Sequence, residues 1–252
     1  MSDEHTVLLL GGTGRTGRRV LEQLLGRGVS VRAIVRSASR LPEGAAGYPR
    51  LTVIVADLLS LGDDELRRHV AGCDAVVSCL GHTISLKGIF GSPRNLVERA
   101  VVRVCGAVKA LRPAEPIRLI LMSSVSVNRP GRFDARRGRL ERAVMWVLRG
   151  LLPPARDNQR AADFLRDQIG ERDPFIQWVA VRPDTLVEGD VSEYAVHQGL
   201  VSSLFAPDET AIANVAHFIC ELITDATVWH DWVCGLPVIV NAASKRHSMA
   251  NV

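Results

Sequence analysis

A glycine-rich turn between an apolar strand and an amphipathic helix constrains this chain more than any other feature. Residues 6–17 read Thr-Val-Leu-Leu-Leu-Gly-Gly-Thr-Gly-Arg-Thr-Gly. The run Val7–Leu10 predicts a buried strand, and the apolar residues that recur after the turn predict one face of a helix: Val20, Leu21, Leu24 and Leu25. In a dinucleotide site such glycines make a tight turn, let the main chain approach a pyrophosphate and let the helix lie close to the strand.

Two glycine spacings overlap in this turn. Gly12, Gly14 and Gly17 fit the pattern G-x-G-x-x-G, and Gly11, Gly14 and Gly17 fit G-x-x-G-x-x-G. The start of the following helix offers free N–H groups and a positive dipole end to phosphates. We therefore predict that the turn binds the diphosphate of a dinucleotide, and an ordinary strand-to-helix turn is the alternative. The predicted binding residues are Gly11, Gly12, Thr13, Gly14, Arg15, Thr16 and Gly17.

The end of the second predicted strand indicates which dinucleotide binds. Ser30–Val35 forms this strand, which completes the βαβ unit that the motif requires. An NAD site carries an acidic residue about 20 residues after the glycines, where it holds the ribose hydroxyls. Here the strand ends in Arg36, and Arg40 follows. A guanidinium group suits a phosphate, so both arginines predict NADP and its 2′-phosphate, unless they are merely solvated.

Strand and helix patterns alternate along the rest of the chain. Most strands are continuous apolar runs, as expected for parallel strands covered on both faces. We predict one NAD(P)-binding domain over residues 1–252, an α/β fold with a Rossmann-type doubly wound parallel sheet. Two substrate-side insertions interrupt it, 128–156 and 184–208. The other predicted strands are Leu51–Val55, Ala75–Cys79, Ile117–Met122, Trp178–Val181 and Val238–Val240, and the helices are Asp63–Val70, Leu96–Leu111, Asn158–Ile169 and Ile212–Ile223.

Composition limits the class of protein and its partners. Of 252 residues, 47% are hydrophobic, which allows a sizeable core, and the net charge of +4 does not argue for nucleic acid. No signal-peptide pattern and no apolar run of membrane-spanning length is present. The five cysteines show no C-x-x-C spacing, which is typical of reduced thiols without a metal site. We expect a cytoplasmic protein with a small-molecule substrate and neither nucleic acid nor membrane as partner, and a homodimer stays open.

Ligands of a doubly wound sheet bind at the carboxyl ends of its strands. At these ends Asp57 is expected to accept a hydrogen bond from the adenine amino group. Small polar residues also form turns at strand ends, which is the alternative for each position. The remaining predicted cofactor contacts are Leu58 beside Asp57, Leu80 and Gly81 at the nicotinamide ribose, Ser123 near the nicotinamide, and Pro183.

These residues together resemble the atypical short-chain dehydrogenase/reductases, in the NmrA-like NAD(P)-binding branch. The likeness is nearest to the flavin/biliverdin-reductase-type members. It implies a Rossmann fold and NAD(P)-dependent oxidoreductase chemistry. The segments that carry it are Gly-Gly-Thr-Gly-Arg-Thr-Gly at 11–17, Val-Arg at 35–36, Arg-Leu-Pro at 40–42, Ala-Asp-Leu at 56–58, Ser-Cys-Leu-Gly at 78–81, Met-Ser-Ser at 122–124 and Val-Arg-Pro at 181–183.

The chain departs from that family at the catalytic pair. Typical short-chain dehydrogenases use a Tyr-x-x-x-Lys pair for proton transfer, but Tyr48 and Tyr194, the only two tyrosines, are not followed by such a lysine. Alignment with the family pattern puts Ala155 where the tyrosine would stand and Gln159 where the lysine would stand. Neither side chain can do acid–base work, so carbonyl–alcohol chemistry does not carry over.

Three functions remain compatible with the residues. The favoured one is an NADPH-dependent reductase of a flavin, quinone or other conjugated molecule, because such hydride transfer demands mainly orientation. The alternatives are a non-redox isomerase or cyclase, with Asp157, Asp184, His82 or His197 as acid or base, and a non-catalytic NADP-binding regulatory sensor.

Three residues are the catalytic candidates. Ser124 would donate a hydrogen bond, and His82 would donate to a substrate carbonyl or act as a general acid near neutral pH. Asp157 precedes the helix expected at Asn158–Ile169. A backbone-bonded loop histidine and a helix cap are the alternatives for His82 and Asp157.

The segment from Arg139 to Leu152 predicts a further amphipathic helix. Its apolar face comprises Leu140, Val144, Val147, Leu148 and Leu151, and arginines supply its charge. The favoured interpretation is a helix packed on its own domain with arginines in water. A cap on the substrate pocket, a contact with a second subunit and an anionic membrane surface are the alternatives, in that order.

Overall fold

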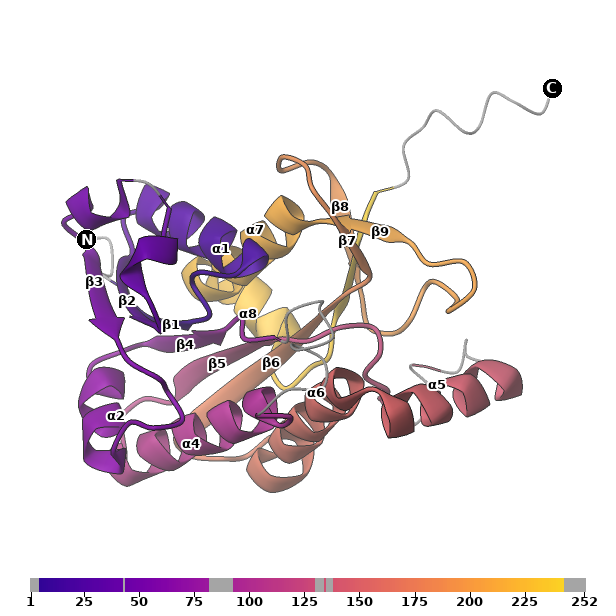
Figure 1. Ribbon diagram of the computed structural model, residues 1–252, viewed down its shortest axis with the longest axis horizontal. Helices are drawn as coiled ribbons and strands as arrows, with labels where there is room; N and C mark the ends of the chain where they lie inside the picture. Colours follow the sequence, from indigo (N-terminus) through magenta and orange to yellow (C-terminus); the bar gives the residue numbers. More distant parts are fainter. Residues whose placement is uncertain (1–4, 43, 82–92, 130–133, 135–137, 243–252) are drawn as a thin grey trace.

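An eight-stranded sheet forms the centre of the computed structural model, which describes residues 5–42, 44–81, 93–129, 134 and 138–242 (Figure 1). The strand order is β3-β2-β1-β4-β5-β6-β10-β8, and every neighbouring pair is parallel except β10 and β8. The strands are β1 (Thr6–Leu10), β2 (Ser30–Val35), β3 (Leu51–Val55), β4 (Ala75–Ser78), β5 (Ile117–Met122), β6 (Ile176–Pro183), β8 (Tyr194–His197) and β10 (Val238–Asn241).

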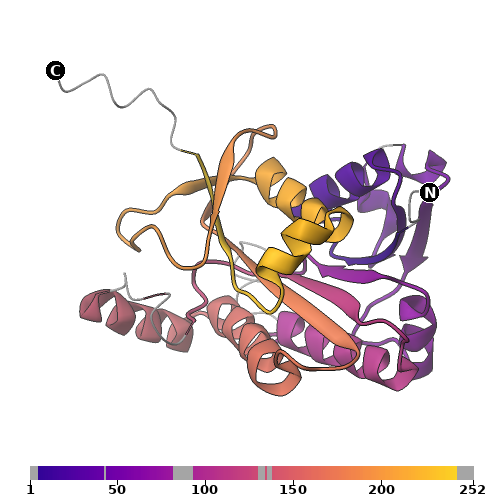
Figure 2. The same ribbon diagram turned by 180° about the vertical axis from the view of Figure 1, so that it is seen from behind.

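Helices cover both faces of this sheet, and each face has its own apolar core. On one face α1 (Arg15–Gly26), α7 (Ile212–Thr224) and α8 (Ala226–Trp232) pack against residues such as Leu9 and Val77. On the other face α2 (Asp63–Val70), α4 (Leu96–Leu111) and α6 (Pro153–Phe164) pack against residues such as Leu8 and Leu119. Figure 2 shows the same layers from behind. The predicted Rossmann-type fold is therefore confirmed.

The chain reverses its direction of winding between β1 and β4. From β1 the strand order runs outward through β2 to β3, and then from β4 through β5 to β6 on the other side. Loops at the carboxyl ends of these two strands diverge to opposite faces, which opens a crevice where ligands of such sheets bind.

Several predicted bounds need correction. The sixth strand is longer at both ends than Trp178–Val181, and α6 begins at Pro153 instead of Asn158. Proline is favoured in the first turn of a helix, because the N–H group that it lacks would have no partner within the helix at that position. The helix then continues into a single π-helical turn, Leu165–Ile169.

The insertion predicted at 184–208 contains more regular structure than its sequence indicates. It begins with β7 (Thr185–Val187), which pairs in parallel with β9 (Glu209–Ala211) in a separate two-stranded sheet. It also contains β8, which adds an antiparallel edge strand to the main sheet. The insertion predicted at 128–156 contains α5 (Arg139–Leu151), which projects from the body of the molecule in Figure 1.

Within the described residues, no helix combines the length and the apolar character that crossing a bilayer requires. The same described residues contain no cluster of His, Cys, Asp and Glu side chains that could hold a metal ion.

Candidate functional site

The glycine turn leaves no room for side chains at two positions. Gly11 has a φ of +79°, and a Cβ built on it would lie 2.6 Å from the Cys79 carbonyl oxygen. A Cβ on Gly17 would lie 2.1 Å from the Gly11 carbonyl oxygen. The helix α1 can therefore lie this close to the turn only because residue 17 is a glycine. A Cβ on Gly12 would meet side chains alone, the flexible one of Leu9 at 3.2 Å and Ala33 Cβ at 4.0 Å. Of the two overlapping spacings, Gly11, Gly14 and Gly17 is the one that the geometry requires.

The start of α1 is open to an anion. Gly14 precedes the helix, no side chain caps the first turn, and that turn contains no acidic residue. The N–H groups of a first turn have no partner within the helix, so a phosphate is well placed to accept their hydrogen bonds. Arg15 lies here too, and its guanidinium donates to Glu188 Oε1 at 3.1 and 2.9 Å, just after β7.

A cleft runs along the carboxyl ends of β1 to β4 and brings most predicted cofactor residues together. Other predicted residues do not line it: Gly12, Thr16 and Gly17 are buried beneath the turn, and Ser123 is buried after β5. Asp57 is exposed in the cleft, and its Oδ1 also accepts a hydrogen bond from the Leu59 N–H at 3.0 Å. The predicted residues that line the cleft are Gly11, Thr13, Gly14, Arg36, Arg40, Asp57, Leu58, Leu80 and Gly81.

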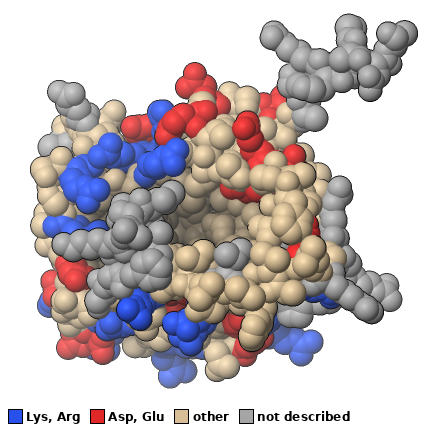
Figure 3. Space-filling model, turned by 45° about the vertical axis from the view of Figure 1, so that its right-hand side comes forward, with Lys and Arg blue, Asp and Glu red and all other residues tan. Residues whose placement is uncertain are grey.

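Arginines dominate the end of the cleft beside β2. Arg36 and Arg40 are exposed, and neither side chain hydrogen-bonds or ion-pairs with another residue of the described chain. Arg18, on α1, donates to the Arg40 carbonyl at 2.6 Å and holds the segment that carries Arg40. In the space-filling view one face of the molecule is hollowed, and basic side chains gather beside the hollow (Figure 3).

A second pocket adjoins the carboxyl ends of β5 and β6, the next strands along the sheet. Ser124, predicted to be catalytic, and Pro183, predicted to contact the cofactor, both line it. Ser124 Oγ hydrogen-bonds Ser126 Oγ, and Met145 of α5 forms part of the wall. A large part of the wall comes from the segment 200–207, and Val125, Asp184 and Thr185 complete the lining.

Three buried carboxylates hold that wall. Asp134 Oδ1 accepts a hydrogen bond from the Leu200 N–H at 3.3 Å, and Glu141 Oε1 accepts from the Leu204 N–H at 3.1 Å and from the Ser203 hydroxyl. Asp184 Oδ2 accepts from the Asp208 N–H at 3.2 Å and from the Ser202 hydroxyl. The three side chains belong to different segments of the chain, so they hold the wall at three separate points.

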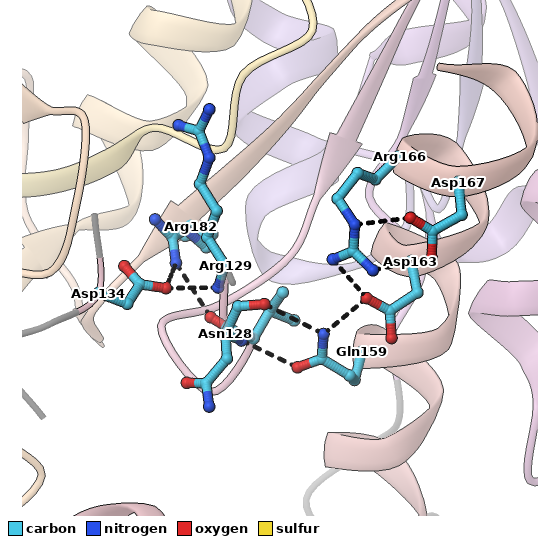
Figure 4. Close-up of polar contacts among 9 residues, drawn as sticks. Asn128, Arg129, Asp134, Gln159, Asp163, Arg166, Asp167 and Arg182 are labelled. Carbon is cyan, nitrogen blue, oxygen red and sulfur yellow. Dashed lines mark hydrogen bonds and ion pairs between the residues drawn. The ribbon is translucent and has the colours of Figure 1, made fainter. Parts of the chain in front are cut away.

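A buried arginine joins this region to the sheet. Arg182 is fully buried at the end of β6, where its Nε donates to the Leu236 carbonyl at 2.9 Å. Its Nη1 donates to the Val127 carbonyl at 3.0 Å and to Asp134 Oδ2 at 2.7 Å (Figure 4). Sequence reasoning missed this role, although a lone arginine in the apolar run 176–183 was a usable signal.

Gln159 stands where the family lysine would be and has a structural partner. Its Oε1 accepts from the Asn128 N–H at 2.9 Å, and its Nε2 donates to the Asn128 carbonyl at 3.2 Å and to Asp163 Oδ1 at 3.0 Å (Figure 4). An amide can pair with both backbone groups because it carries a donor and an acceptor, which lysine does not. Gln159 therefore ties the loop after β5 to α6.

The role expected for Asp157 needs correction. It does not precede its own helix but lies inside α6 at 2% exposure, and its two oxygens accept from the Val97 and Glu98 N–H groups, both at 2.9 Å. It thus caps α4, and an acid–base role would break that cap. The third catalytic candidate, His82, lies outside the described residues.

Of the other acid–base candidates, Asp184 has structural partners as well. Asp184 Oδ1 accepts from the Thr185 N–H at 2.8 Å in addition to the contacts of its second oxygen. His197 lies on β8, opposite Val238 of β10. Near it on β8, the hydroxyl of Tyr194 hydrogen-bonds Nδ1 of His217, a residue of α7, at 2.9 Å.

The helix α5 turns a different face inward than the sequence indicates. Leu140, Val147 and Leu151 of the predicted apolar face are 69%, 46% and 65% exposed. Glu141 and Met145 are buried instead. Because Glu141 binds the 200–207 segment and Met145 lines the pocket, α5 covers that pocket, which was one of the predicted alternatives.

All five cysteines are free, and four of them are buried. Burial raises the pKa of Cys79, which borders the first cleft, to about 12. A thiol needs to ionise to act as a nucleophile, so Cys79 is inert at neutral pH.

Comparison with known proteins agrees with this geometry. A family model described as NAD(P)H-binding matches residues 11–226. An uncharacterised chloroplast protein of Arabidopsis thaliana is 31% identical over 122 residues, which are 48% of this chain. The match spans 42% of the length of that curated relative.

Solved structures share the fold at low sequence identity. A putative NADH-flavin reductase of Streptococcus pneumoniae has a TM-score of 0.65 at 15% identity, covering 94% of this chain and 100% of its own. A short-chain dehydrogenase/reductase of Veillonella parvula, in complex with NADP, has 0.65 at 13%, covering 95% of each chain. An anaerobillin reductase of Escherichia coli O157:H7 has 0.64 at 16%, covering 95% and 98%. These neighbours share the fold of this chain over nearly its full length.

Proposed function

The chain belongs to the NAD(P)H-binding family, and from this premise we propose that it is an NADP-dependent reductase. It transfers hydride from NADPH to a flavin, quinone or another conjugated small molecule, without a Tyr–Lys pair. The observation that carries the proposal is the placement of two cavities next to each other along the carboxyl ends of the strands. An arginine-bordered cleft lies over β1 to β4, and a separate serine-lined pocket lies over β5 and β6, the next strands of the sheet.

The preference for NADP rests on Arg36 and Arg40. Both guanidinium groups border the cleft without a partner in the described chain, where a carboxylate would hold the ribose hydroxyls of NAD. The added 2′-phosphate of NADP would supply the missing anionic partner. One protein of similar fold, from Veillonella parvula, was solved with NADP.

Hydride transfer to a conjugated acceptor fits the side chains in the pocket. The nicotinamide supplies the hydride, and the protein has to align donor and acceptor and exclude competing reactions. Ser124 can donate a hydrogen bond to an acceptor carbonyl, and no step requires Asp157 or Gln159, which are bound elsewhere.

Cofactor selectivity is tested by calorimetry with NADPH and NADH on the wild type, Arg36→Ala and Arg40→Ala. A charge-assisted hydrogen bond contributes about 1.5–3 kcal/mol, so each variant should bind NADPH about 10- to 150-fold more weakly. NADH affinity should stay unchanged. Arg19→Ala is the control, because Arg19 is an exposed arginine of α1 whose ion-pair partner among the described residues is Glu22. Equal wild-type affinities for both coenzymes would refute the NADP assignment.

Turnover is tested by following NADPH absorbance in the presence of FMN, riboflavin or a quinone. We expect oxidation of NADPH with at least one of them. Tight NADPH binding without turnover of any acceptor would instead identify a non-catalytic NADP sensor.

A further inference from the structure

We propose that the acceptor pocket is specific for an uncharged ring system and discriminates against acceptors that carry phosphate or carboxylate groups. The inference rests on the proposed reductase function and names the substrate class for the same site. It concerns the pocket after β5 and β6, which begins at Ser124.

The pocket is in the right place to receive an acceptor. Gly81 borders the dinucleotide cleft after β4, and Ser124 borders the pocket after β5, the strand paired directly with β4. A cofactor whose adenosine end lies beside Arg36 would therefore extend its nicotinamide towards Ser124. The cavity measures about 290 Å³, at the lower end of small-molecule pockets, which span about 300–1,000 Å³.

The described lining carries no cation. Its apolar surface comes from Val125, Met145, Leu200 and Leu204, and its polar groups are hydroxyls and one carboxylate, Asp184. An anionic acceptor would bury its charge here without a counterion, which is costly, whereas a ring carbonyl can accept from a serine hydroxyl.

Two carboxylates lie at the pocket, and the buried cation Arg182, next to the lining residue Pro183, is ion-paired with Asp134. Asp184 lies in the lining, and Glu141 lies directly behind it, bound to the pocket residues Ser203 and Leu204. Glu141 is 8% exposed, and its Oε2 is buried without a hydrogen-bond partner among the described residues. Both carboxylates would repel an acceptor phosphate, and the repulsion is strong where water is excluded.

Riboflavin and FMN provide a matched pair for the test, because they share one ring system and differ in a phosphate. We expect the purified full chain with saturating NADPH to reduce riboflavin with a kcat/KM at least about tenfold higher than FMN, a difference of about 1.4 kcal/mol. An uncharged naphthoquinone should likewise exceed its sulfonate.

A pair of adjacent substitutions tests whether the pocket itself causes this preference. Leu204→Arg places a cation in the lining and should raise the FMN-to-riboflavin ratio of kcat/KM about tenfold. Phe205→Arg is the control, because Phe205 is 65% exposed and does not line the pocket, so its ratio should equal that of the wild type.

The outcomes separate the two proposals. Turnover of both flavins with FMN equal or preferred would overturn this inference and leave the reductase function intact. Absence of turnover with every acceptor would overturn the reductase function and this inference with it. The wild-type ratio decides the matter even if Leu204→Arg fails to fold.

Discussion

Replacing Gly17 with alanine tests the packing of α1 against the glycine turn. The new Cβ would lie 2.1 Å from the Gly11 carbonyl oxygen, 2.8 Å from its carbonyl carbon and 3.1 Å from Gly12 Cα. Ordinary contact begins near 3.5 Å, and all three neighbours are backbone atoms that cannot rotate away. The start of α1 therefore has to move by roughly 1.4 Å, because that is the gap between 2.1 Å and an ordinary contact near 3.5 Å.

The magnitude follows from two opposing effects. Overpacking costs about 1–3 kcal/mol, and a backbone clash belongs at the upper end of this range. Alanine gains about 1 kcal/mol of helix propensity over glycine. We expect a net loss of about 2 kcal/mol, which lowers the Tm by about 4–8 °C in a chain of this size.

Gly106→Ala is the matched control, because the same substitution should have the opposite sign there. Gly106 lies inside α4, and a Cβ built on it meets nothing within 4 Å. Only the propensity gain remains, so the Tm should rise by about 2–4 °C.

Calorimetric melting curves and NADPH titrations of both variants provide the measurement. Gly17→Ala should also weaken NADPH binding, since the displaced helix carries the N–H groups proposed to bind the diphosphate, whereas Gly106→Ala should not. A Gly17→Ala protein as stable as Gly106→Ala would refute the packing argument.

Three further perturbations follow from buried polar contacts. Asp157→Asn should lower stability by about 1 kcal/mol because its NH2 group cannot accept one of the two α4 hydrogen bonds, with kcat per folded molecule unchanged; a large loss of kcat at full stability would contradict this. Asp134→Ala leaves Arg182 buried without its carboxylate partner and should cost about 3–5 kcal/mol in urea unfolding, of which Asp134→Leu with Arg182→Met should restore only a part, because the Leu200 N–H and the Val127 carbonyl then lose their partners. Burial, with a contribution from Arg27, lowers the pKa of His217, so the unfolded chain binds its proton more tightly. Stability should therefore decline as pH falls below about 6.5, and His217→Asn should make that decline shallower in Tm measurements.

The first half of the fold was predictable because local patterns decide it. Continuous apolar runs and the glycine turn fix β1, α1 and β2 within a few residues, since parallel strands buried on both faces need little information from distant partners. The same reason explains why the cleft residues could be named from strand ends alone. Gly11, Arg36 and Leu80 each follow a strand that the sequence marks clearly.

The substrate side was less predictable because distant partners decide it. The strand β8 has no apolar run, and it forms only because Val238–Asn241 offers an edge more than forty residues later in the chain. The amphipathic pattern of α5 gives a helix but not its orientation, which depends on Glu141 reaching the Leu204 N–H. Asp134 lies in an arginine-rich segment, so only its position beside Arg182 reveals a buried ion pair.

The hydrogen bonds that hold the segment 200–207 and the adjoining Asp208 have a consequence for which residues can line the pocket. The carboxylates that hold this segment accept hydrogen bonds from its N–H groups and serine hydroxyls. These carboxylates are Asp134, Glu141 and Asp184, and none of the bonds involves the side chains of Leu200, Leu204 or Pro207. The side chains of Leu204 and Pro207 can therefore be exchanged without loosening the wall, whereas Leu200 is buried in an apolar cluster with Val238 and Val240. Related chains could diverge in what they accept while keeping the same scaffold, and a library randomised at Leu204 and Pro207 would sample new selectivities among mostly folded proteins.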